Sequence, residues 1–96
     1  MLIKAGVDIS RLNRNARRSL PIVAAVFKAF GEELVLTSTY EGTHGDGSLH
    51  YSDDAYDVRK PSVPSGTLEM QLKPALGTDF DMVLEWDHIH IEYDPK

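Results

Sequence analysis

The spacing of hydrophobic residues predicts an amphipathic helix in the first third of the chain. Four of these residues recur at positions i, i+3, i+4 and i+7, the period of one helix face: Val23, Val26, Phe27 and Phe30. Ser19 is placed to cap the start, Pro21 suits a first helical turn, and Gly31 interrupts the pattern. We therefore expect a helix from about residue 20 to residue 30, with this stripe in the core.

Shorter hydrophobic runs predict strands and a second helix. Residues 34–37 and 55–58 are short β-rich runs bounded by Gly or Pro stretches. Near the C-terminus, hydrophobic residues alternate in 80–84 and again in 89–93, with a tight polar connection near Trp86 and Asp87, which predicts a β-hairpin. The spacing of three leucines predicts a helix in which Pro74 limits the length: Leu68, Leu72 and Leu76.

The first 18 residues are polar and weakly patterned. Asp8 and Ser10 can cap a short turn or helix there. We see no linker, internal repeat or low-complexity tract, and 96 residues is the length of one domain. The prediction is a small α+β domain spanning residues 1–96, with two helices packed on an antiparallel sheet.

Composition narrows the chemistry that the domain can carry. The chain is 42% hydrophobic with a formal charge of −5, which is typical of a folded domain. Without cysteine, a metal site must use His, Asp or Glu. The longest apolar run, residues 22–27, is far shorter than the roughly 20 residues of a membrane span, and no secretory signal is visible. We therefore expect cytoplasmic synthesis and no membrane span.

Charge is unevenly distributed along the chain. Six of the ten basic residues lie within the first 28, and their cluster is either a solvated helix face or a contact for an anionic polymer. Eight of the fifteen acidic residues lie in 41–57 and 85–92, together with all four histidines. Because clustered carboxylates repel phosphates, we expect no nucleic-acid partner at the histidine-bearing region.

Two segments, 48–57 and 85–90, contain the candidate metal ligands. A catalytic zinc commonly has three protein ligands drawn from imidazole and carboxylate groups, and it makes a bound water acidic. His50, Asp57 and one histidine of the second segment would supply such a set. In a strand, His88 and His90 point to the same face while Ile89 enters the core, which predicts a site on the sheet.

Zinc-activated water also needs a carboxylate that takes its proton and passes it to the leaving amine. Asp87 and Glu85 are the two candidates, and we favour Asp87 because the hairpin connection frees it from strict alternation. Ser48 can hydrogen-bond either a substrate carboxylate or a metal ligand, although a serine entering a turn needs no functional explanation.

In combination, these residues resemble the M15 family of zinc peptidases. The resemblance covers about residues 34–93 and rests on Ser-x-His at Ser48, Ala-x-Asp at Ala55 and Asp-His-x-His at Asp87. The family includes D-Ala-D-Ala carboxypeptidases, vancomycin-resistance D,D-dipeptidases and phage L-alanyl-D-glutamate endolysins. The resemblance implies an M15-like fold with its zinc site on the sheet.

The resemblance also implies a role for each matching residue. It makes His50, Asp57 and His90 the zinc ligands and Asp87 the general acid/base, and it gives His88 a part in stabilising the oxyanion or orienting the substrate.

The chain departs from the family pattern at two positions. Asp53 stands where glycine is usual, and Glu41 follows Tyr40 where many members carry an arginine that polarises the scissile carbonyl. Three residues are candidates to replace that arginine in contacting the substrate: Arg59, His88 and His44.

The leading hypothesis is a zinc metallopeptidase that hydrolyses an amide bond in peptidoglycan stem peptides, as a D,D-carboxypeptidase or an endolysin-like enzyme. The short length of the chain and the missing export signal lead us to expect a phage or prophage protein that acts on the cell wall after release. The alternative is a catalytically idle, metal-bearing module that binds a cell-wall peptide or forms part of a virion. A small interaction domain with incidental histidines is the third hypothesis.

Overall fold

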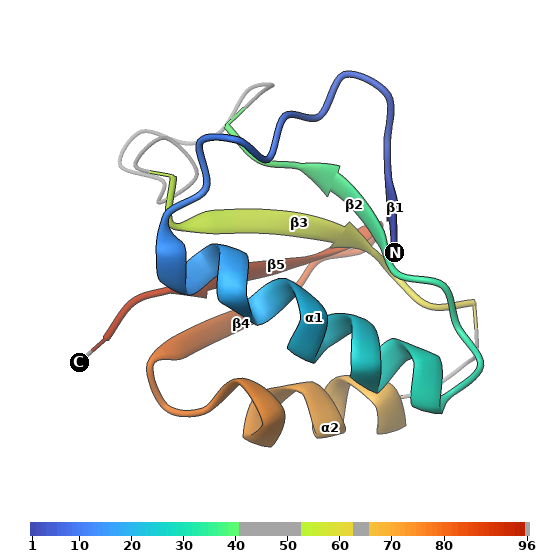
Figure 1. Ribbon diagram of the computed structural model, residues 1–96. Coiled ribbons are helices and arrows are strands. Elements are labelled where there is room, and N and C mark those ends of the chain that lie inside the picture. Colours follow the sequence, from blue (N-terminus) through green and yellow to red (C-terminus); the bar gives the residue numbers. More distant parts are fainter. Residues whose placement is uncertain (41–52, 63–65, 96) are drawn as a thin grey trace.

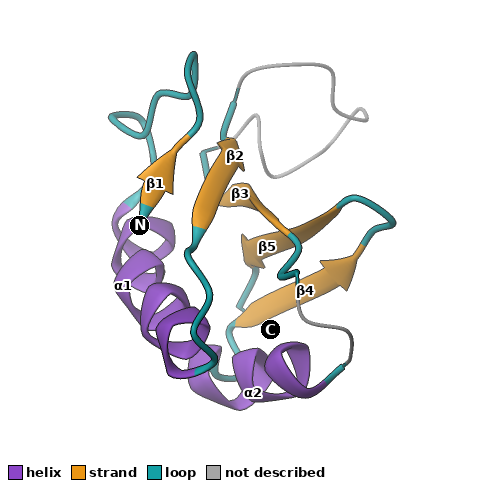
Figure 2. Ribbon diagram, turned by 90° about the vertical axis from the view of Figure 1, so that its right-hand side faces the viewer, coloured by secondary structure: helices purple, strands orange, loops and turns teal. Residues whose placement is uncertain are grey.

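Two helices cover one face of a five-stranded sheet in the computed structural model, which describes residues 1–40, 53–62 and 66–95 (Figures 1 and 2). Along the sheet the strand order is β1-β2-β3-β5-β4. The elements are β1 (Leu2–Ile3), α1 (Arg14–Ala29), β2 (Val35–Ser38), β3 (Ala55–Arg59), α2 (Thr67–Leu76), β4 (Phe80–Leu84) and β5 (His88–Tyr93). The predicted α+β class with two helices on a sheet is confirmed.

The sheet is mixed, so the prediction of a purely antiparallel sheet was wrong. β1 pairs in parallel with β2, and the other neighbouring strands are antiparallel. The Leu2 N–H donates to the Leu34 carbonyl at 2.8 Å, and the Lys4 N–H donates to the Leu36 carbonyl at 2.9 Å. β1 has only two residues and both are exposed, so it produces no hydrophobic alternation that the sequence could reveal. The strand is defined by these backbone hydrogen bonds.

Helix α1 begins at Arg14, six residues before the predicted start. Ser19 is therefore not its cap: its hydroxyl is buried, donates to the Ala16 carbonyl at 2.6 Å and lies 2.5 Å from the Tyr56 hydroxyl. Pro21 lies inside the helix. The end was predicted correctly, since Gly31 follows with φ 72°, a conformation that glycine adopts without steric cost.

The hydrophobic core lies between the helices and the inner face of the sheet. Helix α2 contributes the three predicted leucines, all buried, and Gly77 with φ 86° follows its last residue. Val23 and Phe27 of α1 are buried, while Val26 and Phe30 pack at the border of the core. Leu34, directly before β2, also lies in the core, and the strands add five buried residues: Leu36, Tyr56, Val58, Ile89 and Ile91.

Strand register determines which residues occupy the outer sheet face, away from the helices. In β3, Tyr56 and Val58 enter the core, so Asp57 between them points outward. The pairing of β2 with β3 shifts between Leu36 and Ser38: Leu36 lies opposite Val58, whereas Ser38 lies opposite Asp57. This β-bulge brings Ser38 to the outer face.

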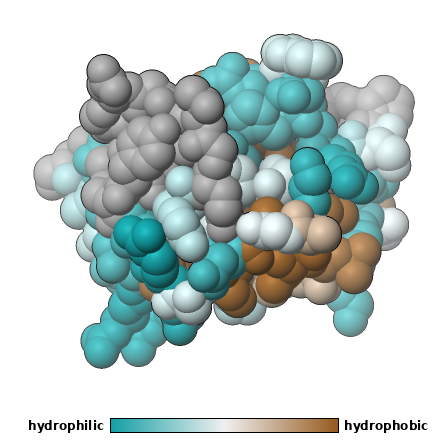
Figure 3. Space-filling model, turned by 90° about the horizontal axis from the view of Figure 1, so that it is seen from above, coloured by the Kyte–Doolittle hydropathy of each residue, from teal (hydrophilic) through white to brown (hydrophobic). Residues whose placement is uncertain are grey.

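The described residues expose both polar and hydrophobic side chains. The face seen in Figure 3 is largely hydrophilic, with one hydrophobic patch. Large hydrophobic residues that are exposed include Met70 at 74% and Trp86 at 88%. In the described part of the chain, neither helix is long and apolar enough to cross a membrane.

Candidate metal and catalytic site

Paired strands β3 and β5 bring two of the predicted ligands together on the outer sheet face. Asp57 lies directly opposite His90 in the register, and its Oδ1 atom is 3.1 Å from His90 Nδ1. The two side chains are 11% and 15% exposed, so they are largely shielded from solvent. The Asp57–His90 pair is therefore built from strand register and side-chain alternation, as a site on the sheet requires.

Glu92 contacts the other ring nitrogen of His90. Its Oε1 atom lies 2.6 Å from His90 Nε2, and it comes from the same strand face because it is two residues further along β5. The contact with Asp57 raises the pKa of His90, burial opposes this increase, and Glu92 adds to it. Two carboxylates thus fix the orientation of one imidazole ring.

His88 extends this arrangement toward solvent. Its Nε2 atom lies 3.7 Å from Asp57 Oδ2, and its Nδ1 atom lies 2.7 Å from Asp87 Oδ1. Five side chains therefore form a continuous chain along the outer sheet face, which we call the carboxylate–imidazole row: Glu92, His90, Asp57, His88 and Asp87. Its exposed end is Asp87, whose side chain is 53% exposed.

The row includes the residue favoured as the general base and leaves out its competitor. Asp87 lies on the connection between β4 and β5 and contacts His88 through its side chain. Glu85 is exposed, and its backbone N–H donates to the His88 carbonyl at 2.9 Å. The structure therefore provides a side-chain contact for Asp87 within the row.

The other predicted site residues are not part of this described geometry. Arg59 is exposed at the end of β3, opposite His88 in the register. The remaining residues named from the sequence lie outside the described part of the chain: Glu41, His44, Ser48 and His50. Among the predicted zinc ligands, the structure thus describes Asp57 and His90.

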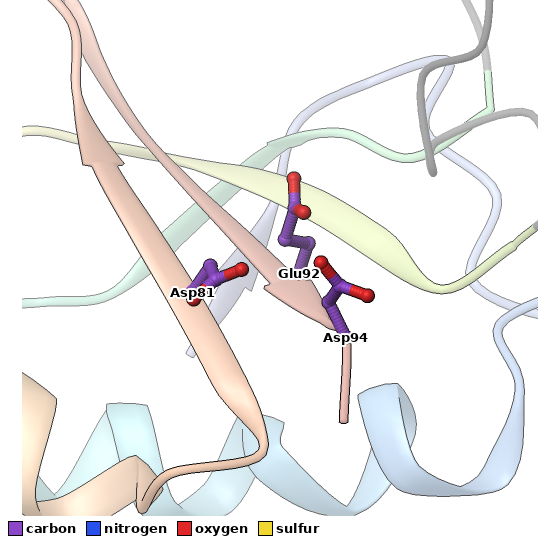
Figure 4. A group of neighbouring side chains, drawn as sticks. All are labelled: Asp81, Glu92 and Asp94. Atoms are coloured by element: carbon purple, nitrogen blue, oxygen red, sulfur yellow. The ribbon is translucent and has the colours of Figure 1, made fainter. Parts of the chain in front are cut away.

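A group of three carboxylates that the sequence analysis did not anticipate shares Glu92 with the row. Asp81 of β4, Glu92 of β5 and Asp94 after β5 have ligand oxygens within 4.8 Å of one another (Figure 4). Strand register brings them together, since Asp81 lies opposite Glu92 and the Asp94 N–H donates to the Asp79 carbonyl. Surface acids often gather without binding a metal, so this group alone does not define a site.

A groove on the other side of β4 differs in character from the row. It has a volume of about 860 Å³ and lies between α2 and β4, with Met70, Pro74, Phe80 and Met82 among its lining residues. Phe80 and Met82 lie opposite Tyr93 and Ile91, on the helix-facing side of the sheet. The groove therefore opens beside α2, away from His90 and Asp57, although three ionisable residues also line it: Glu69, Lys73 and Asp81.

Comparisons with family models, curated proteins and solved structures found no match to this chain.

Proposed function

We propose that the protein is a zinc metallopeptidase that hydrolyses an amide bond in peptidoglycan stem peptides. The main support is the 3.1 Å distance between Asp57 Oδ1 and His90 Nδ1 on the outer sheet face. Two donor atoms bound about 2.0 Å from one tetrahedral zinc ion lie about 3.3 Å apart. Asp57 and His90 therefore have the spacing of two ligands to a shared ion.

The chemistry of the residues around this pair also suits zinc. Carboxylate oxygen and imidazole nitrogen are both zinc donors, and a ligating histidine usually donates its second ring N–H to a carboxylate or carbonyl. Glu92 occupies that position on His90. His50 is the third ligand by the resemblance to M15 peptidases. When bound, zinc supplies a Lewis acid that polarises a carbonyl and makes water acidic near neutral pH.

Asp87 and His88 supply the proton transfer and substrate orientation in this proposal. Asp87 accepts a proton from the attacking water and passes it to the nitrogen of the leaving amine, so its solvent-exposed position suits a group that meets substrate. His88 lies between Asp87 and Asp57, where its imidazole can donate to the developing oxyanion or orient the substrate. Arg59 lies at the end of β3 that is opposite His88, and its cationic side chain could bind a carboxylate of the peptide.

The substrate class comes from the family resemblance. Stem peptides carry D-amino acids and free carboxylates, and the M15 family cleaves bonds within them. The geometry of the row supports amide hydrolysis in general, because a metal-ligand pair and a nearby carboxylate suit acyl transfer to water.

The test combines zinc stoichiometry with product analysis by mass spectrometry. Zinc-loaded protein is incubated with muropeptides and short D-amino-acid peptides, beside a chelated control and the variants His90→Ala, Asp87→Ala and Glu85→Ala. We expect one zinc per chain and hydrolysis in the wild type, loss of both in His90→Ala, and retained zinc with lost hydrolysis in Asp87→Ala. Glu85→Ala is the matched control and retains both.

Each other outcome has a definite meaning. Stoichiometric zinc without any product contradicts the peptidase and supports the idle binding module. Hydrolysis that survives in both His90→Ala and Asp87→Ala overturns the proposed chemistry. Retention of zinc in His90→Ala overturns the assignment of His90 as a ligand.

A further inference from the structure

We propose that a basic hollow at the start of α1 binds phosphate groups of a flexible phosphodiester polymer. This arginine hollow is lined by residues 10–14 together with Arg17 and Arg18, and its volume is about 520 Å³. It contains four of the ten basic residues in a chain whose net charge is −5. The proposal is independent of the metal site.

Two of the four arginines are held in place by contacts within the protein. The Arg11 guanidinium lies 4.2 Å from the centre of the Tyr40 ring and 3.5 Å from Asp53 Oδ2. Arg17 donates to the Ser10 carbonyl at 2.8 Å and to the Ile9 carbonyl at 3.2 Å. These contacts fix both guanidinium groups beside the hollow. Binding an anion therefore costs less side-chain conformational entropy.

The other two arginines are available for a ligand. Arg14 and Arg18 are exposed, and neither side chain forms a hydrogen bond or an ion pair with another described residue. They are four residues apart on α1, so their side chains lie on the same helix surface. A guanidinium presents several N–H donors in one plane, which suits two oxygens of one phosphate group.

This arrangement is unfavourable for the isolated helix. Like charges at i and i+4 repel each other, and cations in a first helical turn oppose the helix dipole. The first turn of α1 contains no acidic residue that would offset these charges, and Asn13 makes no side-chain cap. An anion in the hollow would relieve both effects, so charge complementarity identifies the ligand as anionic.

The residues around the arginine hollow favour a narrow, flexible polymer over nucleic acid. The lining residues contain no aromatic ring on which a base could stack, and Arg11 already covers Tyr40. Asp53 and Asp54 lie next to the hollow, since Asn13 contacts both: its N–H donates to the Asp53 carbonyl, and its Nδ2 lies 2.6 Å from Asp54 Oδ1. These acids limit the basic surface to a short stretch, whereas a duplex needs a broad one.

The test compares binding of poly(glycerol phosphate) with binding of an oligothymidylate of equal charge, by calorimetry over a range of salt concentrations. The variants are R14Q/R18Q and, as a matched control, K60Q/K73Q, which removes two exposed cations elsewhere. We expect poly(glycerol phosphate) to bind the wild type and K60Q/K73Q equally. In R14Q/R18Q its affinity falls about tenfold or more, and the slope of log affinity against log salt falls in magnitude by about one to two, because two cations are lost.

Thermal unfolding separates loss of a ligand site from loss of structure. Without ligand, R14Q/R18Q has a melting temperature equal to or above that of the wild type, because repulsion in α1 is relieved. A clear decrease would show that the arginines serve folding and would overturn the proposal. Equal losses of affinity in both double variants, tighter binding of oligothymidylate, or no binding of poly(glycerol phosphate) would also overturn it.

Discussion

Asp57 and His90 face each other across two antiparallel strands, with Asp57 Oδ1 3.1 Å from His90 Nδ1. The contact is the main reason that the pKa of His90 is raised above its ordinary value of 6.5. In metal-free protein, the Asp57→Asn variant should therefore have a lower His90 pKa. Titration of the ring protons by NMR measures it, and an unchanged value would show that Asp57 is not the cause.

The same pair makes the stability of the metal-free protein depend on pH. Because the folded-state pKa of His90 is raised, protonation favours the folded state. This contribution is fully present below pH 6.5 and is lost as the pH rises through the folded-state pKa. Urea unfolding in the presence of chelator should show the loss in the wild type and a smaller loss in Asp57→Asn.

Glu92 should tune the proposed zinc site without being a ligand. It contacts His90 Nε2 at 2.6 Å, and removing such a partner typically weakens metal binding about 10- to 100-fold. We expect Glu92→Ala to lose zinc affinity by that factor, measured by competition with a chelating dye. Asp81→Asn, which changes the neighbouring acidic group, is the control, and an equal loss there would assign the metal to that group instead.

Tyr56 and Ser19 link β3 to α1 through buried hydroxyl groups 2.5 Å apart. Burial raises the pKa of Tyr56 well above its ordinary value of 10. A raised pKa means that the stabilising contribution is complete below pH 10 and is lost as the pH rises toward the folded-state pKa. Tyr56→Phe should cost about 1 kcal/mol at pH 7 and make alkaline unfolding less steep, as measured by urea unfolding over a range of pH.

Asp53 has φ 65°, a left-handed conformation in which residues with a side chain are uncommon. Aspartate and asparagine tolerate it better than alanine does, and glycine adopts it freely. The variants Asp53→Gly and Asp53→Ala both lose the contact with Arg11. The difference between their unfolding free energies therefore reports on the backbone conformation at this position. We expect the glycine variant to be the more stable by about 1 kcal/mol in urea unfolding. The reverse order would exclude backbone strain here.

Helix α2 should owe its position to three buried leucines. Leu72 is fully buried, so Leu72→Ala should cost about 2 to 5 kcal/mol of unfolding free energy. Met70 on the same helix is 74% exposed, and Met70→Ala should change it by less than about 0.5 kcal/mol. Urea unfolding of both variants measures the difference, and similar losses would contradict the packing described.

Hydrophobic alternation was sufficient to predict that His88 and His90 share one face of β5. Ile89 and Ile91 are buried, so the two histidines share the opposite face, where both contact Asp57. In contrast, Ser19 and Pro21 resemble a helix start, although the buried face of α1 continues back to Ala16. The buried residues there are small or polar, so the hydrophobic pattern is weak.

Two features that depend on contacts between distant segments were not predicted. Leu2 and Ile3 become a strand only through backbone bonds around β2, which the sequence pattern does not encode. Asp81 and Asp94 approach each other because of the β4–β5 register, although 13 positions separate them. Residue types suggested which groups can carry chemistry, but strand register determined which of them meet.

The bulge between Leu36 and Ser38 separates two functions of a single short strand. Before it, β2 pairs through Leu36 with the core residue Val58, and after it, Ser38 lies beside Asp57 on the outer face. The bulge adds one residue to β2 relative to β3, so Ser38 pairs with Asp57 and not with Tyr56. One short strand therefore supplies a core residue at Leu36 and, two positions later, a neighbour of Asp57 on the outer face, which strict alternation would have turned toward the core.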